Sequence, residues 1–358
     1  MNRPRRDFIK QLALATSAVA TFPQMAVSQQ KVLGVALVGL GYYSTDLLAP
    51  ALQRTKHCKL AGIVTGSPHK IPKWQKQYGI PDGNVYNYQN MRQIADNPEI
   101  DVIYIVLPTG LHSKYAIMAA QSGKHVWCEK PMARTVSECE AIIKACAENK
   151  VKLSIGYRMQ HEPNTQTIMR FAREKPYGEI RELFAHAGYF DGRSNHWKQN
   201  KALGGGALYD MGVYPINALR YATGLEPLAV TARHETTRPE IYHEVDETTY
   251  FELEFPGGIK GQGATSLGKG MNELKVTCEN GDYGLSPFQA YGGIRGAASD
   301  GFKLNQTIPN QQAKQMDDDA LAILENKPVI VPGEEGLMDI KVVEAAYRAA
   351  KSGEKVII

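Results

Sequence analysis

The sequence has few cysteines, no metal-binding motif and no internal repeat. Its cysteines are scattered, odd in number and never spaced as CxxC; they are Cys58, Cys128, Cys139, Cys146 and Cys278. This pattern argues against a disulfide framework and a cysteine zinc site. No HExxH motif or Cys/His cluster is present, so we expect no bound metal. The 358 residues, 43% hydrophobic and 22% charged, predict two ordinary globular domains.

Residues 1–28 have the layout of an export signal. A basic start with Arg5-Arg6 precedes an apolar stretch, 12–22, and the small residues 26–28. The paired arginines resemble the twin-arginine signal. The apolar stretch is shorter than the ~20 residues that span a bilayer. We expect export to the periplasm by this route and no stable membrane insertion; a disordered basic tail and a membrane anchor are the alternatives.

Without these residues the chain is no longer basic. Residues 1–28 hold four positive charges and one negative charge, so their removal lowers the net charge from +4 to about +1. A nucleic-acid-binding protein needs a basic surface. We therefore expect no nucleic-acid partner.

Residues 31–155 carry the pattern of a dinucleotide-binding Rossmann domain. The Val-rich run 31–38 ends at a Gly-Leu-Gly turn, a helix-compatible stretch covers 44–52, and a second apolar run covers 60–64. Strand, glycine turn, helix and strand open this fold. The first glycine permits the tight turn, and the second lets the backbone approach a pyrophosphate at the helix N-terminus. Ser44 replaces the usual third small residue. We expect nucleotide contacts from Gly39, Leu40, Gly41 and Tyr42.

The end of the second strand indicates which dinucleotide binds. An NAD enzyme usually places Asp or Glu there for the ribose 2′-hydroxyl. The sequence here is IVTGSPHK, residues 63–70, which has no carboxylate. A 2′-phosphate would find hydroxyl, backbone and ammonium donors at Thr65, Gly66, Ser67 and Lys70. The cofactor is therefore predicted to be NADP; a solvated loop with an incidental lysine is the alternative.

Residues 156–358 predict a second domain with an antiparallel sheet. Residues 178–190 alternate like a strand, and 248–267 read as two strands around a Pro-Gly-Gly turn. Residues 272–286 repeat this pattern around Asn-Gly. Residues 317–328 and 334–353 are amphipathic helices with acidic starts. The fold class is therefore α/β followed by a separate α+β domain.

Several motifs occur together in the order found in one enzyme family. They are the GLG turn, LPTGLH (107–112), GKHVWCEKPMA (123–133), IGYR (155–158), GGGALYDMGVY (204–214) and NKPVIVPGEEGLMD (326–339). They resemble the Gfo/Idh/MocA oxidoreductases, and among these most the glucose–fructose oxidoreductase group. The resemblance implies a Rossmann domain followed by an α/β domain with a large, mostly antiparallel, open-faced sheet. It also implies sugar substrates, a homo-oligomer (dimer or tetramer) packed through that face, and a C-terminal helix able to pack back on the first domain.

The resemblance further implies a catalytic group of Lys130, Tyr214 and Asp210. Removal of a hydride from a carbinol carbon needs a base for the hydroxyl proton. A tyrosine, with an ordinary pKa of about 10, becomes such a base beside an ammonium. Tyr214 would be the acid–base, Lys130 would lower its pKa and bind the reacting oxygen, and Asp210, on the same helical face, would accept a sugar hydroxyl. A solvated lysine, a packed tyrosine and a helix-start carboxylate are the alternative readings.

Other positions that match the family are expected near the cofactor. Glu129 would hold the nicotinamide ribose, and Arg158 and Trp197 lie where relatives touch cofactor or substrate. Lys198 follows Trp197 where relatives often have Arg, which argues against an anion site there. The glycines 204–206 would let the backbone pass close to cofactor or sugar. The loop after the fourth strand would line the cofactor through Leu107, Pro108, Thr109 and His112, the last by packing or capping.

Two modes of action stay open, and we favour the first. In the first, NADP remains bound while an aldose is oxidised at C1 to a lactone and a second sugar is then reduced. In the second, NADP exchanges, as in an ordinary xylose- or glucose-type dehydrogenase. Export favours retention of NADP. The resemblance also implies an arm that covers NADP, but the segment before the first strand is so short that this arm is missing or vestigial, which favours exchange. An NAD-assisted redox glycosidase and a non-catalytic cofactor-binding regulator are further hypotheses.

Overall fold

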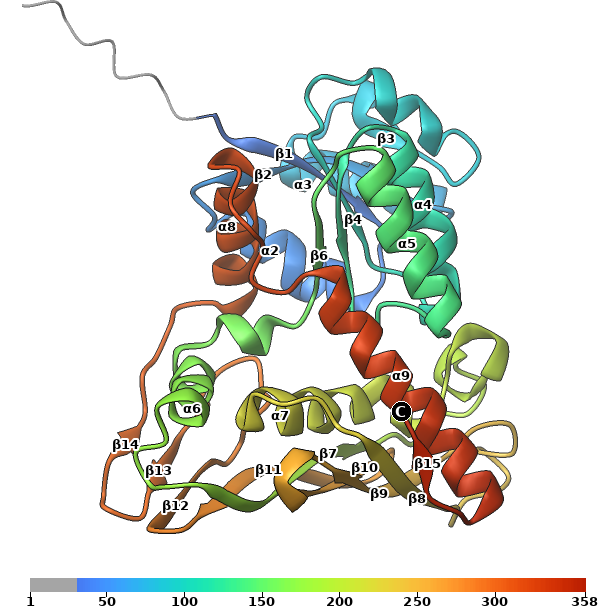
Figure 1. Ribbon diagram of the computed structural model, residues 1–358. Helices are drawn as coiled ribbons and strands as arrows, with labels where there is room; N and C mark the ends of the chain where they lie inside the picture. The colour runs from blue at the N-terminus through green and yellow to red at the C-terminus, as the bar shows by residue number, and fades with distance from the viewer. Residues whose placement is uncertain (1–30) are drawn as a thin grey trace, which may run out of the picture. The chain divides into compact units, whose positions relative to one another are not determined.

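Six apolar runs in the first half of the chain form a parallel sheet (Figure 1). Its order is β3-β2-β1-β4-β5-β6, and every neighbouring pair is parallel. Strands β1 and β4 are buried along their whole length, as expected where helices cover both faces of a sheet. The strands are β1 (Leu33–Val38), β2 (Cys58–Val64), β3 (Val85–Tyr86), β4 (Val102–Ile105), β5 (His125–Cys128) and β6 (Leu153–Ile155).

The computed structural model describes residues 31–358, and residues 32–358 make one compact unit. The export signal predicted for residues 1–28 lies outside the described residues. The predicted Rossmann sheet is confirmed by the strand order.

A helix from the C-terminal part of the chain completes one face of this sheet. The face is covered by α2 (Ala49–Leu52), α3 (Ile71–Tyr78) and α8 (Gln311–Leu324). Ala313, Met316 and Ala320 of α8 belong to the same buried cluster as Leu37 and Trp74. The other face packs against α4 (His112–Gln121) and α5 (Val136–Glu148). The first domain is therefore built from two distant parts of the sequence.

The second sheet has nine strands in the order β14-β13-β12-β11-β7-β10-β9-β8-β15. Its neighbours are antiparallel except for the parallel pair β7 and β10. The turns predicted at Pro256–Gly258 and Asn280–Gly281 connect β9 to β10 and β11 to β12. The strands are β7 (Ile180–Phe190), β8 (Ala229–Glu235), β9 (Thr248–Glu254), β10 (Lys260–Ser266), β11 (Gly268–Cys278), β12 (Gly281–Leu285), β13 (Gly296–Ala298), β14 (Lys303–Leu304) and β15 (Val356–Ile357).

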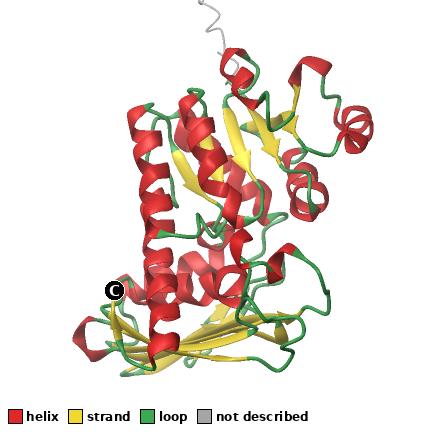
Figure 2. Cartoon of the chain, turned by 90° about the vertical axis from the view of Figure 1, so that its right-hand side faces the viewer, coloured by secondary structure: helices red, strands yellow, loops and turns green. Residues whose placement is uncertain are grey.

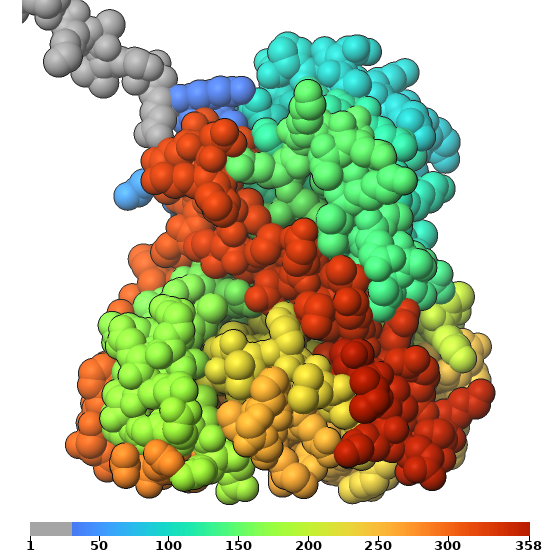
Figure 3. All heavy atoms as spheres, viewed as in Figure 1, coloured from blue at the N-terminus to red at the C-terminus, as the bar shows by residue number. Residues whose placement is uncertain are grey.

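Helices lie on one face of this second sheet only. Figures 1 and 2 show α6 (Pro163–Glu174), α7 (Val213–Thr223) and α9 (Gly333–Ser352) above the sheet, and no helix of residues 31–358 on its other face. Helix α9 contacts α5 and β6 of the first domain as well as α7 and β8 of the second, and its red atoms run along both domains in Figure 3. None of the helices in the described range is both long enough and apolar enough to cross a bilayer.

Candidate active site

The glycine turn after β1 has a backbone that only glycine fits and an open space beside it. Gly39 has φ +94°, and a Cβ there would clash with the carbonyl of Val106. The Ser44 hydroxyl donates a 2.5 Å hydrogen bond back to the Gly39 carbonyl, which ties the turn to the π-helical segment Tyr43–Leu48. A Cβ on exposed Gly41, by contrast, would meet no atom within 4 Å. This space beside a helix N-terminus fits a pyrophosphate.

The loop after β2 brings a cation to this glycine turn. Lys70 donates a 2.6 Å hydrogen bond from Nζ to the carbonyl oxygen of Leu40. The buried Thr65 hydroxyl accepts one of 3.0 Å from the Ser67 backbone N–H, and Gly66 is exposed. An ammonium has further donors to offer a phosphate, and no carboxylate occurs in residues 65–70. The donor set suits the 2′-phosphate of NADP.

The loops after β4 and β5 are fastened together through a buried histidine. The ring nitrogens of His112 lie 2.8 Å from the Pro131 carbonyl oxygen and 2.7 Å from that of Leu107. Burial lowers the pKa of His112, so the neutral ring donates to one of these carbonyls at a time. Thr109 is also buried, while Pro108 precedes it at the half-exposed start of the loop. His112 therefore positions the loop that carries Lys130.

Glu129 lies at the end of β5, on the inner side of the same loop. It is buried and accepts a 2.6 Å hydrogen bond from the Tyr104 hydroxyl. Burial raises the pKa of Glu129, against the lowering effect of Tyr104, Lys130 and Arg158. Its neighbour Lys130 is followed by a cis peptide bond to Pro131.

The three residues predicted to be catalytic come together where the two domains meet. Lys130 Nζ lies 4.3 Å from the centroid of the Tyr214 ring and donates a 2.9 Å hydrogen bond to the backbone oxygen of Asp210. Asp210 lies in a π-helical turn, Leu208–Gly212, that leads directly into α7, where Tyr214 is the second residue. The Tyr214 hydroxyl itself bonds a different cation, NH1 of Arg158, at 2.7 Å.

Arg158 was expected to touch cofactor or substrate, and the structure shows that it is the hydrogen-bond partner of Tyr214. It follows β6, is 2% exposed, and is held through Nε by a 3.1 Å hydrogen bond to Oε1 of Gln311. Burial raises the pKa of the Tyr214 phenol, but the charges of Arg158 and Lys130 and the bond to Arg158 lower it more, so its net pKa is below the ordinary value. The pair is therefore suited to hold a phenolate.

The Asp210 carboxylate is paired on one oxygen and open on the other. Its Oδ2 accepts hydrogen bonds of 2.7 Å from Lys198 Nζ and 3.1 Å from the Tyr189 hydroxyl. Among residues 31–358, no hydrogen-bond partner reaches Oδ1. Burial raises the pKa of Asp210, but Lys198 and Lys130 lower it more, and the net pKa is below the ordinary value. The ionised Oδ1 is therefore available to a ligand hydroxyl.

Trp197 lies on this Asp210 side of the site. Its ring contacts are with His196, at 5.8 Å between centroids, and with Lys198 Nζ, at 5.8 Å. The sequence predicts no anion site at Lys198. In the structure, its ammonium forms an ion pair with the Asp210 carboxylate. Sequence reasoning missed this pair, although Lys198 follows the singled-out tryptophan directly.

The glycines 204–206 allow close contacts with neighbouring parts of the protein. A Cβ on Gly204 would lie 2.8 Å from the Thr109 Cβ, and one on Gly205 would clash with the Lys198 carbonyl. Gly206 has φ +106°, and a Cβ there would clash with the Asp246 carboxylate. These contacts explain why the three positions cannot carry side chains. The close approach of cofactor or sugar to this backbone stays a prediction.

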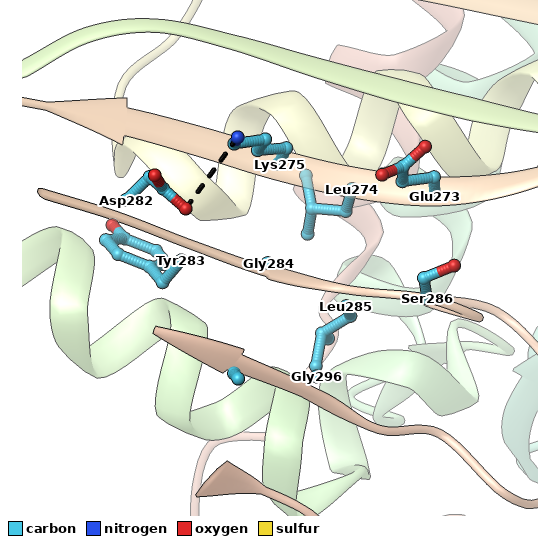
Figure 4. Close-up of a pocket in the computed structure, with 10 residues that line it drawn as sticks. Glu273, Leu274, Lys275, Asp282, Tyr283, Gly284, Leu285, Ser286 and Gly296 are labelled. Atoms are coloured by element: carbon cyan, nitrogen blue, oxygen red, sulfur yellow. Dashed lines mark ion pairs between the residues drawn. The ribbon is translucent and has the colours of Figure 1, made fainter. Parts of the chain in front are cut away.

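A hollow on the second sheet holds none of the predicted site residues. Figure 4 shows it between β11, β12 and β13, with Lys275 Nζ 3.8 Å from Asp282 Oδ1 across neighbouring strands. No group of three or more His, Cys, Asp or Glu side chains within residues 31–358 is arranged to hold a metal ion. The chemistry-bearing side chains gather instead at the domain junction described above.

Comparison with known proteins shows the family to which the chain belongs. Residues 33–157 match the model of the Gfo/Idh/MocA oxidoreductase family with an NAD-binding Rossmann fold, and residues 165–283 match the C-terminal domain of that family. A crystal structure of aldose-aldose oxidoreductase from Caulobacter crescentus is 37% identical, with a TM-score of 0.88 over 92% of this chain and 100% of that chain.

Two curated relatives extend the comparison. D-xylose 1-dehydrogenase [NADP(+)] of Haloarcula marismortui is 26% identical over 90% of this chain and 92% of its own length. scyllo-Inositol 2-dehydrogenase (NADP(+)) of Bacillus subtilis is 24% identical over 90% and 95%. The chain thus belongs to the Gfo/Idh/MocA oxidoreductases, the family that its motifs predicted.

Proposed function

We propose that the protein is an NADP-dependent sugar oxidoreductase that oxidises an aldose at C1 to the lactone and then reduces a second sugar without releasing its cofactor. The observation that carries the proposal is the buried Tyr214 hydroxyl, bonded to Arg158 with Lys130 over its ring. The similarity to aldose-aldose oxidoreductase supports the pairing of two sugars. Lys70 at the glycine turn, together with the NADP(+) named for two relatives, supports the choice of dinucleotide.

The residues of the site divide the work by their charge. The Tyr214 phenolate takes the proton of the C1 hydroxyl as the C1–H bond breaks. Lys130, a compact ammonium beside that ring, stabilises the oxygen that becomes a carbonyl. Oδ1 of Asp210 accepts a second sugar hydroxyl and orients the ring. When bound, NADP would supply a nicotinamide able to accept the C1 hydride of one sugar and to donate a hydride to the carbonyl carbon of the next.

In this cycle Tyr214 accepts one proton and later returns it, so no net proton is gained or lost. Oxidation of the first sugar leaves its hydroxyl proton on the phenol oxygen, and reduction of the second sugar returns that proton to the new hydroxyl. Tyr214 is only 6% exposed, which suits a group that exchanges its proton with substrate. A buried acid–base used alternately in both directions needs no further proton donor.

An exchangeable-cofactor sugar dehydrogenase is the second candidate. The similarity to D-xylose 1-dehydrogenase [NADP(+)] over nearly the full length of both chains favours it. The same residues would then carry out oxidation only, with NADP entering and leaving in each turnover. The redox-glycosidase hypothesis has less support because residues 65–70 hold no carboxylate for the 2′-hydroxyl of NAD.

Nucleotide retention separates the two candidates. The purified protein is desalted, and any nucleotide left is released by denaturation and identified by mass spectrometry. Stoichiometric NADP that one aldose reduces and a second sugar reoxidises, with no nucleotide added, supports the proposal. Complete loss of nucleotide on desalting, with activity restored only by added NADP, would assign the exchangeable dehydrogenase instead.

We further propose that residues 1–28 direct export through the twin-arginine route and that the open sheet face packs against a second copy in a dimer or tetramer. Replacement of Arg5 and Arg6 by Lys should leave the protein in the cytoplasmic fraction, whereas the unchanged chain should reach the periplasm. Native mass spectrometry should give a multiple of the chain mass; a single-chain mass would overturn the oligomer.

A further inference from the structure

The loop between β12 and β13, residues 286–295, is anchored at both ends and has few contacts at its tip. Phe288 is 1% exposed, and its backbone N–H donates a 3.0 Å hydrogen bond to Oδ1 of Asn272. Ile294 is 4% exposed and fixes the other end. Between them a Cβ on Gly292 or Gly293 would meet no atom within 4 Å. The tip is therefore held mainly by the side chain that precedes these glycines, Tyr291.

The ring of Tyr291 connects the two walls of the candidate active site. Its centroid lies 4.6 Å from Cζ of Arg158, the residue bonded to the Tyr214 hydroxyl. It also lies 6.1 Å from the ring centroid of Tyr43, with 40° between the ring planes. Tyr43 is the first residue of the helical segment that follows the glycine turn. One side chain of the second domain thus contacts both the nucleotide-binding wall and the acid–base wall.

The partial exposure of Tyr291 fits a contact that can open. The residue is 49% exposed although it is a large aromatic side chain, so one part of it packs and the rest faces solvent. An aromatic pair and a cation–π contact each stabilise a structure only modestly. Contacts of this size slow the separation of two walls without preventing it, as loop closures over bound ligands do.

We propose that Tyr291 is a nucleotide-retaining residue of the site. Its ring holds the nucleotide-binding wall, at Tyr43, and the acid–base wall, at Arg158, together over a bound dinucleotide. This inference rests on the proposed function, in which NADP remains bound between two half-reactions. A loop of the second domain would thus slow nucleotide release. This slowing should depend on the ring of Tyr291 and not on its hydroxyl, because the ring makes both contacts.

The test measures how fast NADPH leaves the protein. Wild type and variants are loaded with NADPH, freed of excess, and mixed with an enzyme that oxidises only free NADPH, while nicotinamide fluorescence is followed. Tyr291→Ala and Tyr291→Leu remove the ring, and Tyr291→Phe keeps it. Phe190→Ala removes another exposed aromatic side chain, 65% exposed on β7, and serves as the control. Circular dichroism and Tm verify that each variant is folded.

We expect Tyr291→Ala and Tyr291→Leu to release NADPH about tenfold faster than wild type, because both contacts of the ring are lost; tenfold corresponds to about 1.4 kcal/mol. Tyr291→Phe and Phe190→Ala should match wild type. Equal release rates for wild type and both ring-less variants would overturn the inference, and so would a Tyr291→Phe rate as fast as that of Tyr291→Ala. Rapid release from wild type would refute retention, but the ratio of variant to wild-type rates would still decide the role of Tyr291.

Discussion

NH1 of Arg158 donates a 2.7 Å hydrogen bond to the hydroxyl of Tyr214. The guanidinium cannot lose its proton and is held in place by Gln311, so its charge is fixed beside the phenol. Lys130, which the sequence suggested for this task, lies over the ring and not at the hydroxyl. Both cations favour ionisation of Tyr214, but only Arg158 bonds its hydroxyl. The Nζ of Lys130 bonds the Asp210 carbonyl and keeps further N–H donors, which we propose meet the reacting oxygen.

Tyr214→Phe removes the proposed acid–base and keeps the ring under Lys130. We expect aldose oxidation to fall by about 10²–10⁴-fold, the usual contribution of such a group, with nucleotide affinity unchanged. Tyr221→Phe, buried on the same helix, is the matched control and should keep its activity. Undiminished activity in Tyr214→Phe would favour the hypothesis of a non-catalytic regulator. Steady-state rates and nucleotide titration give both readouts.

The pH dependence of aldose oxidation should report the Arg158–Tyr214 pair. Oxidation needs the phenolate, so its rate should rise with pH through the Tyr214 pKa, which lies below the ordinary value of about 10. Arg158→Met removes the fixed charge and should move this rise to higher pH, and Arg158→Lys should restore part of the shift. If Arg158→Met lowered the oxidation rate equally at every pH and left the midpoint of the rise unchanged, Arg158 would only support the structure around Tyr214. Rates of the first half-reaction at a series of pH values provide the measurement.

Short-range patterns in the sequence predicted much of the fold. They could not predict the side chains that reach the site from distant parts of the chain, because those contacts depend on long-range packing. Gly39 and the Pro256–Gly258 turn are short-range signals, and both lie where expected. Gln311 and Tyr291 reach the site from loops and helices more than a hundred residues away from Arg158, and no periodicity encodes such contacts. The π-helical turn at Asp210 likewise replaces the regular helix assumed from its four-residue spacing to Tyr214.

Asp210→Asn should weaken sugar binding more than nucleotide binding. An amide keeps the shape but loses the charge that pairs with Lys198 and that would accept a sugar hydroxyl through Oδ1. Hydrogen bonds to charged groups are worth about 1.5–3 kcal/mol, so we expect KM for the aldose to rise about 10- to 100-fold. Lys198→Met should raise the Asp210 pKa and cause a smaller loss that grows as pH falls. An altered nucleotide affinity with an unchanged KM for sugar would contradict this role.

Lys70→Ala should reduce discrimination in favour of NADP. The ammonium at the Leu40 carbonyl is the charge we expect at the 2′-phosphate, and its loss should weaken NADP binding about 10- to 100-fold. NAD, which lacks that phosphate, should bind as before. Lys73→Ala, exposed on α3, is the control. Equal weakening of both nucleotides would show that Lys70 acts by supporting the glycine turn.

Arg220→Met should weaken the packing of α7, the helix that carries Tyr214, against α9, and the loss of stability should depend on pH. Arg220, on α7, is 4% exposed and bonds Asp339 of α9 at 2.6 Å, along with Glu335 and Glu226. Loss of one member of a buried ion pair costs about 3–5 kcal/mol. Arg233→Met, at an exposed pair on β8, should cost less than about 1 kcal/mol.

The sign of the pH effect follows from Asp339. Burial raises its pKa to about 7 against the lowering effect of Arg220. A carboxyl with a raised pKa in the folded state contributes to stability below its unfolded pKa, and this contribution is lost as pH rises through about 7. Without Arg220 the ionised form has no cation, so urea unfolding should show a larger loss at about pH 8 than at about pH 6. An equal loss of unfolding free energy at both pH values would show that Asp339 does not set the stability of the α7–α9 contact.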